Sequence, residues 1–233
     1  MSHCCEMNMN IGHFLEECAL GSHLCSIYNS TEEQLAVVVS YIKIGLERNE
    51  QCLYILDENS RSTIISALKK AGVHVDEALR SEALIFMTIK DTYLNTVCFD
   101  PSILIHFFED FLKILKSKGF IALRVSVEMT WILNGDITQK SLVQFESELH
   151  HFFQNNDALL MCQYSMERFP SGLLAEMIHS HPLIVFADMV CRNSFHSPAR
   201  SDHVKNATGE NVNDLLISMS VREYLRRIGG FDS

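Results

Sequence analysis

The side chains best suited to chemistry occur in two pairs, each with a spacing of two residues. His23 and Cys25 form one pair, and Cys162 and Tyr164 form the other, both in short apolar segments typical of buried strands. Because side chains on a strand return to the same face every second residue, each pair should point in one direction. If both pairs face one cavity, His23, Cys25 and Cys162 could be ligands of a soft metal or of haem iron, or walls of a polarizable pocket. The alternative is a core cysteine beside a hydrogen-bonded histidine.

A third candidate is the segment 119–131, in which charged residues interrupt a buried-strand pattern. Residues 120–127 form an apolar run, yet Arg124 lies inside it and Glu128 follows it directly. Such side chains are rarely buried unless they are paired. In open α/β sheets ligands bind beyond the carboxyl ends of the strands, where Glu128 and Trp131, the only tryptophan, should emerge. We therefore expect a ligand site at this strand end, with two separate structural ion pairs as the alternative.

Two weaker signals lie at the ends of other predicted strands. His179 and His181 precede an apolar segment and could act as ligands, although a histidine before a proline at the start of a strand is more often structural. Asp57 and Glu58 follow another strand pattern, where they are candidates for a polar pocket wall.

These residues must be positioned by an alternation of strands and helices. Six segments have the composition of buried strands: 22–28, 52–56, 84–89, 120–127, 159–164 and 183–190. Helical patterns lie between them at 31–48, 63–71, 101–116, 142–153 and 172–178. Strands that alternate with helices predict a three-layer α/β fold, in which a mostly parallel sheet is flanked by helices on both faces.

The chain divides into three parts by its composition. Residues 1–20 are a Cys/His-rich lead-in with one short helical pattern, and residues 21–192 form the globular domain. Residues 193–233 comprise a polar linker and an amphipathic helix over 215–228. We expect this last helix to be either a connector to a downstream module or the contact of a homodimer.

Charge and composition exclude several classes of protein. The formal net charge of −10, without a segregated basic patch, argues against direct binding to nucleic acid. The sequence has neither an apolar stretch of membrane-spanning length nor a secretory signal, so we expect a cytoplasmic protein without a membrane contact. Its 8 cysteines are scattered through the chain, which is typical of reduced thiols rather than a disulfide framework.

The turn after the first predicted strand does not suit a nucleotide. Residues 27–31 contain neither the glycines nor the lysine of a phosphate-binding loop, so we expect no binding or hydrolysis of ATP. The known triad and zinc-protease motifs are also absent from the sequence. An enzyme that uses Glu128 as a base, or Cys25 or Cys162 as a nucleophile, is the weaker alternative, because no activating neighbour is identifiable.

Several separated motifs occur together in one order along the chain. They are Gly21-Ser-His-Leu-Cys25 with Tyr28, Gly45-Leu46, Gln51-Cys-Leu-Tyr-Ile55, Phe99-Asp-Pro101, Arg124 with Glu128-Met-Thr-Trp131, Phe145-Glu146, Cys162-Gln-Tyr164 and His181-Pro182. In these motifs the sequence resembles the MEDS domain, the methanogen/methylotroph DcmR sensory domain, over residues 20–192. More distantly it is similar to RecA/KaiC-like ATPases, but without their glycine-rich loop.

The resemblance implies a sensory domain rather than an enzyme. It implies detection of a hydrocarbon derivative, such as a halomethane or a methylated compound, on behalf of a downstream signalling module or partner protein. Carried over by position, the ligand-binding residues are His23, Cys25, Tyr28, Arg124, Glu128, Trp131, Cys162, Tyr164 and His181. No cofactor follows from the resemblance, and the metal candidates remain His23, Cys25 and Cys162.

Overall fold

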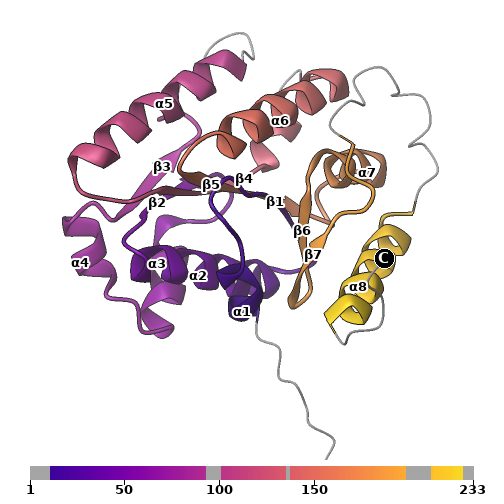
Figure 1. Cartoon of the computed structure of the whole chain (residues 1–233), viewed down its shortest axis with the longest axis horizontal. Helices are drawn as coiled ribbons and strands as arrows, with labels where there is room; N and C mark the ends of the chain where they lie inside the picture. The colour runs from indigo at the N-terminus through magenta and orange to yellow at the C-terminus, as the bar shows by residue number, and fades with distance from the viewer. Residues whose placement is uncertain (1–10, 93–100, 135–136, 198–210, 228–233) are drawn as a thin grey trace, which may run out of the picture.

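The computed structural model describes residues 11–92, 101–134, 137–197 and 211–227, and a seven-stranded sheet lies at its centre (Figure 1). The strands are β1 (His23–Tyr28), β2 (Gln51–Leu56), β3 (Leu84–Thr88), β4 (Leu123–Glu128), β5 (Ala158–Ser165), β6 (Leu183–Phe186) and β7 (Met189–Arg192). Their order is β3-β2-β4-β5-β1-β6-β7, and each neighbouring pair is parallel except β6 and β7. The predicted α/β class with a mostly parallel sheet is confirmed.

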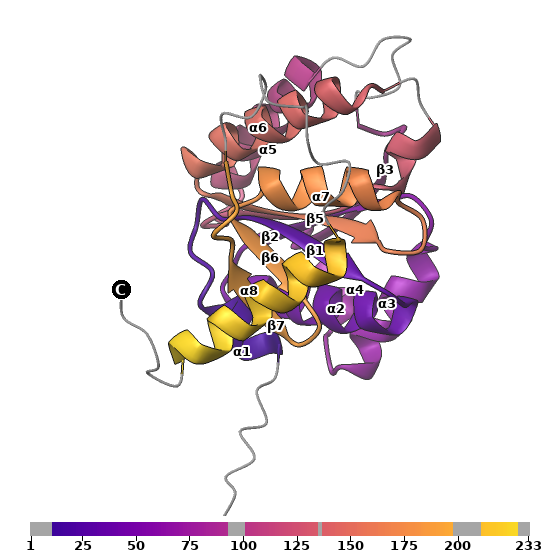
Figure 2. The same cartoon turned by 90° about the vertical axis from the view of Figure 1, so that its right-hand side faces the viewer.

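Helices cover both faces of this sheet, so the molecule has three layers (Figure 2). One layer contains α1 (Ile11–Glu16), α2 (Thr31–Glu47), α3 (Arg61–Lys70) and α4 (Val75–Arg80). The opposite layer contains α5 (Pro101–Ser117), α6 (Gln139–Gln154) and α7 (Ser171–Ser180). A short 3-10 helix, η1 (Thr130–Asn134), follows β4, and α8 (Val212–Arg227) packs against β7 and α7.

The sheet divides the core in two, because alternate residues of each strand face opposite layers. On β4, Val125 and Val127 belong to the apolar core beneath α5 and α6. Arg124 instead lies over the ring of Tyr41 in α2, and Glu128 contacts the loop that leads into α3. The predicted site residues therefore cannot all face one cavity.

The segment 183–190 is not the single strand that its apolar pattern predicts. It forms an antiparallel hairpin in which Leu183 lies opposite Arg192 and Phe186 lies opposite Met189. The chain turns at Ala187, whose φ of 51° lies in the left-handed region. Glycine or asparagine is usual at such a position, so an alanine there does not predict a turn.

The six helices that were predicted with bounds are present, and their ends lie within three residues of the predicted ones. Ser30 is the N-cap of α2, since its hydroxyl accepts a hydrogen bond from the backbone N–H of Glu33 (3.2 Å). Asp100, which is expected to be the N-cap of α5 because Pro101 suits the first helical position, lies outside the described residues. The six-residue helix α4 was not predicted, because it is too short to show helical periodicity. Strand β4 begins at Leu123 rather than at residue 120.

The two flanking segments pack against the central body. Helix α1 contacts α2 and β7, and α8 contacts β7 and α7. Arg227 of α8 pairs with Glu17 (2.8 Å) and lies 4.1 Å from the ring centroid of Phe14. The division of the chain at residues 20 and 192 stays a prediction. Within the described ranges, none of the helices is both long enough and apolar enough to span a membrane.

Candidate functional site

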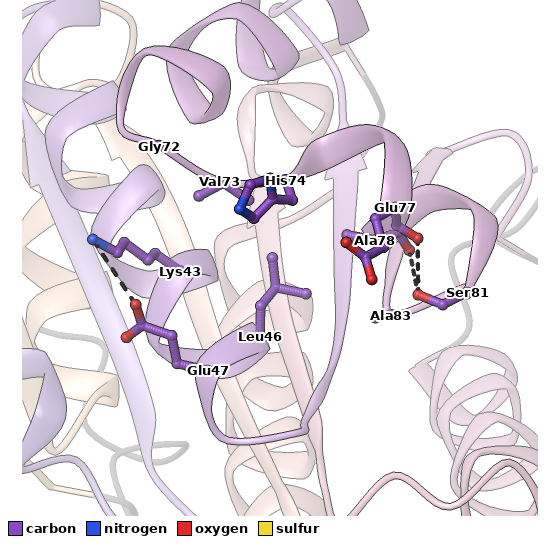
Figure 3. A pocket seen from close by; sticks show the side chains of 10 residues that line it. All are labelled: Lys43, Leu46, Glu47, Gly72, Val73, His74, Glu77, Ala78, Ser81 and Ala83. Carbon is purple, nitrogen blue, oxygen red and sulfur yellow. Dashed lines mark hydrogen bonds and ion pairs between the residues drawn. The ribbon is translucent and has the colours of Figure 1, made fainter.

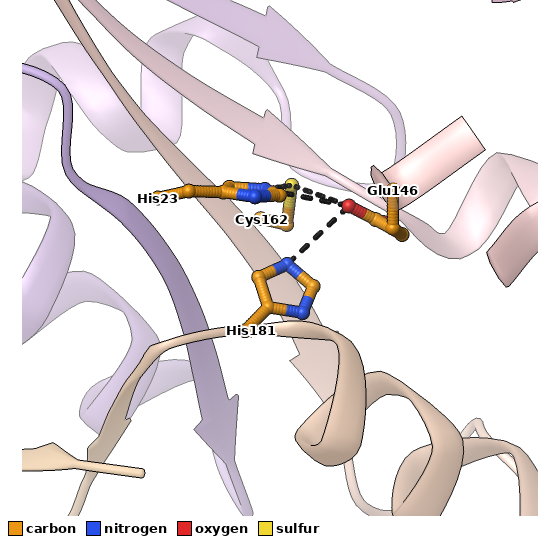
Figure 4. A group of neighbouring side chains, drawn as sticks. All are labelled: His23, Glu146, Cys162 and His181. Carbon is orange, nitrogen blue, oxygen red and sulfur yellow. Dashed lines mark hydrogen bonds and ion pairs between the residues drawn. The ribbon is translucent and has the colours of Figure 1, made fainter. Parts of the chain in front are cut away.

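Four buried side chains from separate parts of the chain meet on the side of the sheet covered by α5–α7 (Figure 4). They are His23 at the start of β1, Glu146 in α6, Cys162 in β5 and His181 directly after α7. One donor atom from each residue lies within 4.8 Å of the donor atoms of the other three. All four residues are completely buried, with 0% of their surface exposed. We call these four residues the buried donor cluster.

Strand register explains why the cluster forms. Strands β1 and β5 are parallel neighbours, with Cys25 opposite Cys162 and His23 two residues earlier on the same face. Glu146 follows Phe145 on the buried side of α6, so its side chain is directed at the sheet. His181 ends α7, where Asn193 holds the backbone by donating from Nδ2 to the His181 carbonyl oxygen (2.8 Å).

The contacts of the cluster converge on one oxygen of Glu146. His23 Nε2 lies 3.3 Å from Glu146 Oε2, and His181 Nε2 lies 3.3 Å from the same oxygen. Cys162 Sγ is 3.8 Å from this oxygen and 3.5 Å from His23 Nε2. The Tyr164 hydroxyl donates a hydrogen bond to the other oxygen, Oε1. The predicted residues Cys162, Tyr164, His23 and His181 are thus joined by one carboxylate.

Burial and mutual contact shift the ionisation of these groups. Burial, together with the neighbouring His181, lowers the pKa of His23 to about 4. Burial alone would raise the pKa of Glu146, but the imidazoles of His181 and His23 lower it well below its usual range overall. Burial and the Glu146 carboxylate raise the pKa of the Cys162 thiol. In the absence of a bound cation, the cluster therefore contains an ionised carboxylate, a neutral His23 and a protonated thiol.

The ring of His181 is held in a defined orientation. Its Nδ1 lies 2.7 Å from the carbonyl oxygen of Met177, which can only accept a hydrogen bond. Nδ1 must therefore carry a proton and donate it to this carbonyl, so that Nε2 faces Glu146. His23 is held differently, because its ring stacks on that of His150 at 5.9 Å.

An apolar cavity adjoins the cluster and shares Cys162 with it. Its wall is formed by β2, β4, β5, α5, α6 and η1, and it includes Val127, Trp131 and Phe145. Trp131 meets Phe145 edge to face, with ring centroids 6.3 Å apart. The volume is about 10 Å³, which is room for about one water molecule, and its wall is apolar throughout. Trp131 therefore lies beside a small apolar space.

Glu128 lies on the opposite face of the sheet and its hydrogen-bonding capacity is used within the chain. Its Oε2 accepts hydrogen bonds from the three consecutive backbone N–H groups of Asp57, Glu58 and Asn59, at 3.1, 2.7 and 2.9 Å. Its Oε1 accepts from the hydroxyl of Tyr54 at 2.7 Å. The carboxylate therefore fastens the loop after β2, and its proposed ligand role stays a prediction.

Arg124 has its partner at the other end of the same strand. Its Nε donates to the carboxylate of Glu50, and its guanidinium lies 4.6 Å from the ring centroid of Tyr41. Helix α2 approaches this side chain closely at Gly45, where a Cβ would lie 2.7 Å from Arg124 Cδ. Arg124 and Glu128 are thus separate anchors, and the ligand role of Arg124 also remains a prediction.

In the turn after β1, the backbone N–H group of Asn29 is occupied by the side chain of Glu33, whereas a phosphate-binding loop would leave such groups free for an anion. Glu33 Oε2 accepts hydrogen bonds from the backbone N–H (2.8 Å) and the side-chain Nδ2 (3.2 Å) of Asn29. A carboxylate at this helix start competes with any anion. Tyr28 ends β1 nearby, where burial and the Glu128 carboxylate raise the pKa of its hydroxyl. The absence of ATP binding stays a prediction.

A surface groove of about 330 Å³ lies at the end of the sheet where β2 and β3 begin, between α2, α4 and the start of β3 (Figure 3). Lys43 and Glu47 of α2 form an ion pair across 3.9 Å on one side, and His74 and Glu77 lie on the other. None of the predicted site residues lines this groove. It therefore takes no part in the candidate site.

Sequence reasoning missed Glu146 as a member of the site, although the motif that contains it was recognised. The available signal was its position, because α6 buries Leu142, Phe145 and Leu149 on one side, and Glu146 lies four residues after Leu142 on that side. An acid within the apolar face of a helix requires a partner in the core. Here the partners are the two histidines of the cluster.

Comparisons with known proteins agree with this architecture. The family model of the MEthanogen/methylotroph, DcmR Sensory domain (MEDS) matches residues 22–182, and no enzyme family is identified. No curated protein sequence matches the chain. Among solved structures, a KaiC-like protein from the hyperthermophilic archaeon Pyrococcus horikoshii OT3 is similar, with a TM-score of 0.50 and 8% sequence identity. The match covers 71% of this chain and 70% of that protein, and at such identity it shows the fold alone.

Proposed function

Because this chain belongs to the MEDS family of sensory domains, we propose that it detects a small hydrocarbon derivative or methylated compound. We further propose that binding is communicated through α8 to a partner protein or output module. The family assigns the sensory role, and the class of ligand is our proposal.

The observation that supports this function is the small apolar cavity beside Cys162. A cavity this small is filled only when its walls move apart, so a guest of one or two carbons would displace η1 or α6. Trp131 lies in η1, and α6 contributes both Phe145 to the cavity and Glu146 to the cluster. A ligand that prefers the widened cavity would shift the domain toward that conformation.

A series of contacts leads from the cluster to the C-terminal helix. Asn193 fixes the end of α7 next to His181, and its Oδ1 accepts a hydrogen bond from the backbone N–H of Phe195 (2.8 Å). Arg222 of α8 lies 5.3 Å from the ring centroid of Phe195 and donates to the Ser194 hydroxyl (2.6 Å). Movement at the end of α7 would therefore reach α8 through residues 193–195.

A fluorescence titration tests this function, because Trp131 is the only tryptophan. We expect saturable changes in its emission with dichloromethane or methanol as probes. Val127→Ile adds a methylene to the wall of the cavity and should remove the response. Val125→Ile makes the same change on the same face of β4 but outside the cavity wall, and should keep it. Unchanged emission with both probes, or an equal response in the two variants, would contradict the proposal.

A further inference from the structure

The buried donor cluster has the arrangement of a metal site, and we infer that His23, Glu146, Cys162 and His181 bind one Zn²⁺ ion. Two imidazoles, one thiolate and one carboxylate are all established zinc ligands. The four donors come from β1, α6, β5 and the residue after α7, and their side chains point toward one another (Figure 4). A metal ion at this site would link β1 and β5 to α6 and to the end of α7.

Four of the six distances between donor atoms are close to the edges of a tetrahedron around zinc. With bonds of about 2.0–2.1 Å to nitrogen or oxygen and about 2.3 Å to sulfur, the edges are about 3.3 Å for nitrogen to oxygen and about 3.5 Å for either to sulfur. The two nitrogen–oxygen separations to Glu146 are 3.3 Å each, and the nitrogen–sulfur separation from His23 to Cys162 is 3.5 Å. The oxygen–sulfur separation is slightly longer, at 3.8 Å. The two remaining separations, from the donor atom of His181 to those of His23 and Cys162, are no longer than 4.8 Å.

Surrounding groups orient two of the donors toward this centre. His181 donates its Nδ1 proton to the carbonyl oxygen of Met177, which leaves the lone pair of Nε2 for a metal. Tyr164 donates to Oε1 of Glu146 and so presents Oε2 to the cluster. Supporting hydrogen bonds of this kind are the usual companions of metal ligands.

Charge balance also fits a zinc ion. His181 Nε2 lies 3.3 Å from Glu146 Oε2, which is the separation expected between two ligands of one ion. A Zn²⁺ ion would bind both atoms. It also neutralises the charges of Glu146 and a Cys162 thiolate, whose proton is released to water on binding. The metal-free alternative is a buried ion pair of an imidazolium with Glu146.

Zinc binding does not require the small-molecule function proposed above, because the apolar cavity and the cluster share only Cys162. Failure of the two proposals can be told apart. A domain that binds zinc but no small molecule refutes only the first, and a domain that responds to dichloromethane without taking up metal refutes only the second.

The test is titration of the metal-free full chain with Co²⁺ and Zn²⁺, followed by elemental analysis. We expect one equivalent of metal, the visible absorption of tetrahedral Co²⁺ and a thiolate-to-cobalt charge-transfer band. Cys162→Ser should abolish the charge-transfer band and weaken Zn²⁺ binding by more than about 100-fold, the upper loss seen when only a supporting partner is removed. Cys25→Ser, which changes the opposing buried thiol in β1, should retain both.

Circular dichroism shows whether each variant is folded. The result for the wild-type chain decides the question even if Cys162→Ser does not fold. No stoichiometric metal uptake by the wild-type chain, or octahedral Co²⁺ absorption, would overturn the inference. An equal effect of Cys25→Ser and Cys162→Ser on the charge-transfer band would overturn it as well.

Discussion

Two buried glutamates on opposite faces of the sheet show how differently one residue type can be used. Glu128 is 2% exposed and Glu146 is 0% exposed, and each accepts a tyrosine hydroxyl on one oxygen. The second oxygen of Glu128 is satisfied by three backbone N–H groups, whereas that of Glu146 faces His23, Cys162 and His181. The three backbone N–H groups make Glu128 an anchor of the loop after β2, whereas we propose that the side chains around Glu146 form a ligand set. Burial of a carboxylate alone does not distinguish the two.

The same contrast extends to the neighbouring side chains. Around Glu128, Gln163 receives a hydrogen bond from Gln34 (2.8 Å) and donates one to Ser126 (2.9 Å), so this network is paired within the chain. On the other face, His23 Nδ1 has no hydrogen-bond partner among the described residues. In our proposal the face covered by α5–α7 holds the site, and the face covered by α1–α4, where Arg124 Nη1 and Nη2 also have no hydrogen-bond partner among the described residues, is scaffold.

The largest expected effect that separates the faces is stabilisation by zinc. At a free Zn²⁺ concentration 1,000 times its dissociation constant, binding should add about 4 kcal/mol to the free energy of unfolding. For a chain of this length the melting temperature should rise by about 8–16 °C. Glu146→Gln should remove the gain, and Glu148→Gln, on the same helix but outside the cluster, should keep it. Thermal denaturation with and without Zn²⁺ measures this, and equal gains in both variants would contradict it.

Glu128→Gln should show the opposite behaviour. Loss of the charge weakens the bonds from three backbone N–H groups, so we expect the free energy of unfolding to fall by about 3 kcal/mol. Zinc affinity should be unchanged. Urea denaturation together with a Zn²⁺ titration checks both. A variant of normal stability that no longer responds to dichloromethane would instead support the predicted role of Glu128 as a sensing residue.

A smaller effect tests how closely α2 packs against Arg124 on the scaffold face. In Gly45→Ala the new Cβ would meet Cys52 Sγ at 2.6 Å and Arg124 Cδ at 2.7 Å, so we expect a loss of about 2 kcal/mol. Gly172→Ala is the matched control, because a Cβ there meets no atom within 4 Å. Chemical denaturation of both variants measures the difference. Equal stabilities would mean that α2 is free to move away from Arg124.

The smallest expected effect is kinetic and concerns the site face. His150 stacks on His23, and His196 packs edge-on against His150 at 5.4 Å, so a line of imidazoles leads outward from the cluster. His150→Gln should slow zinc exchange several-fold and leave the affinity unchanged. His151→Gln, which alters an exposed neighbour, should have neither effect. Stopped-flow transfer of zinc to a chelator measures the rates, and equal rates would exclude a route along this line.

Sequence patterns were informative where regular backbone sets direction. The spacing of two residues placed His23 with Cys25, and Cys162 with Tyr164, on common faces, and the alternation of elements gave the fold class. The partners of Glu128 could not be predicted, because they are backbone N–H groups of a loop and any sequence offers them. The hairpin at Ala187 was missed because a residue without turn preference adopts the left-handed conformation there.

The most direct measurement is X-ray absorption at the zinc edge of the zinc-loaded wild-type chain. The difference between the two glutamates requires that Glu146, but not Glu128, binds the ion together with the thiolate of Cys162 and two imidazoles. We predict one sulfur at about 2.3 Å and three nitrogen or oxygen donors at about 2.0–2.1 Å. A zinc shell without sulfur, or with six light donors, would contradict this assignment.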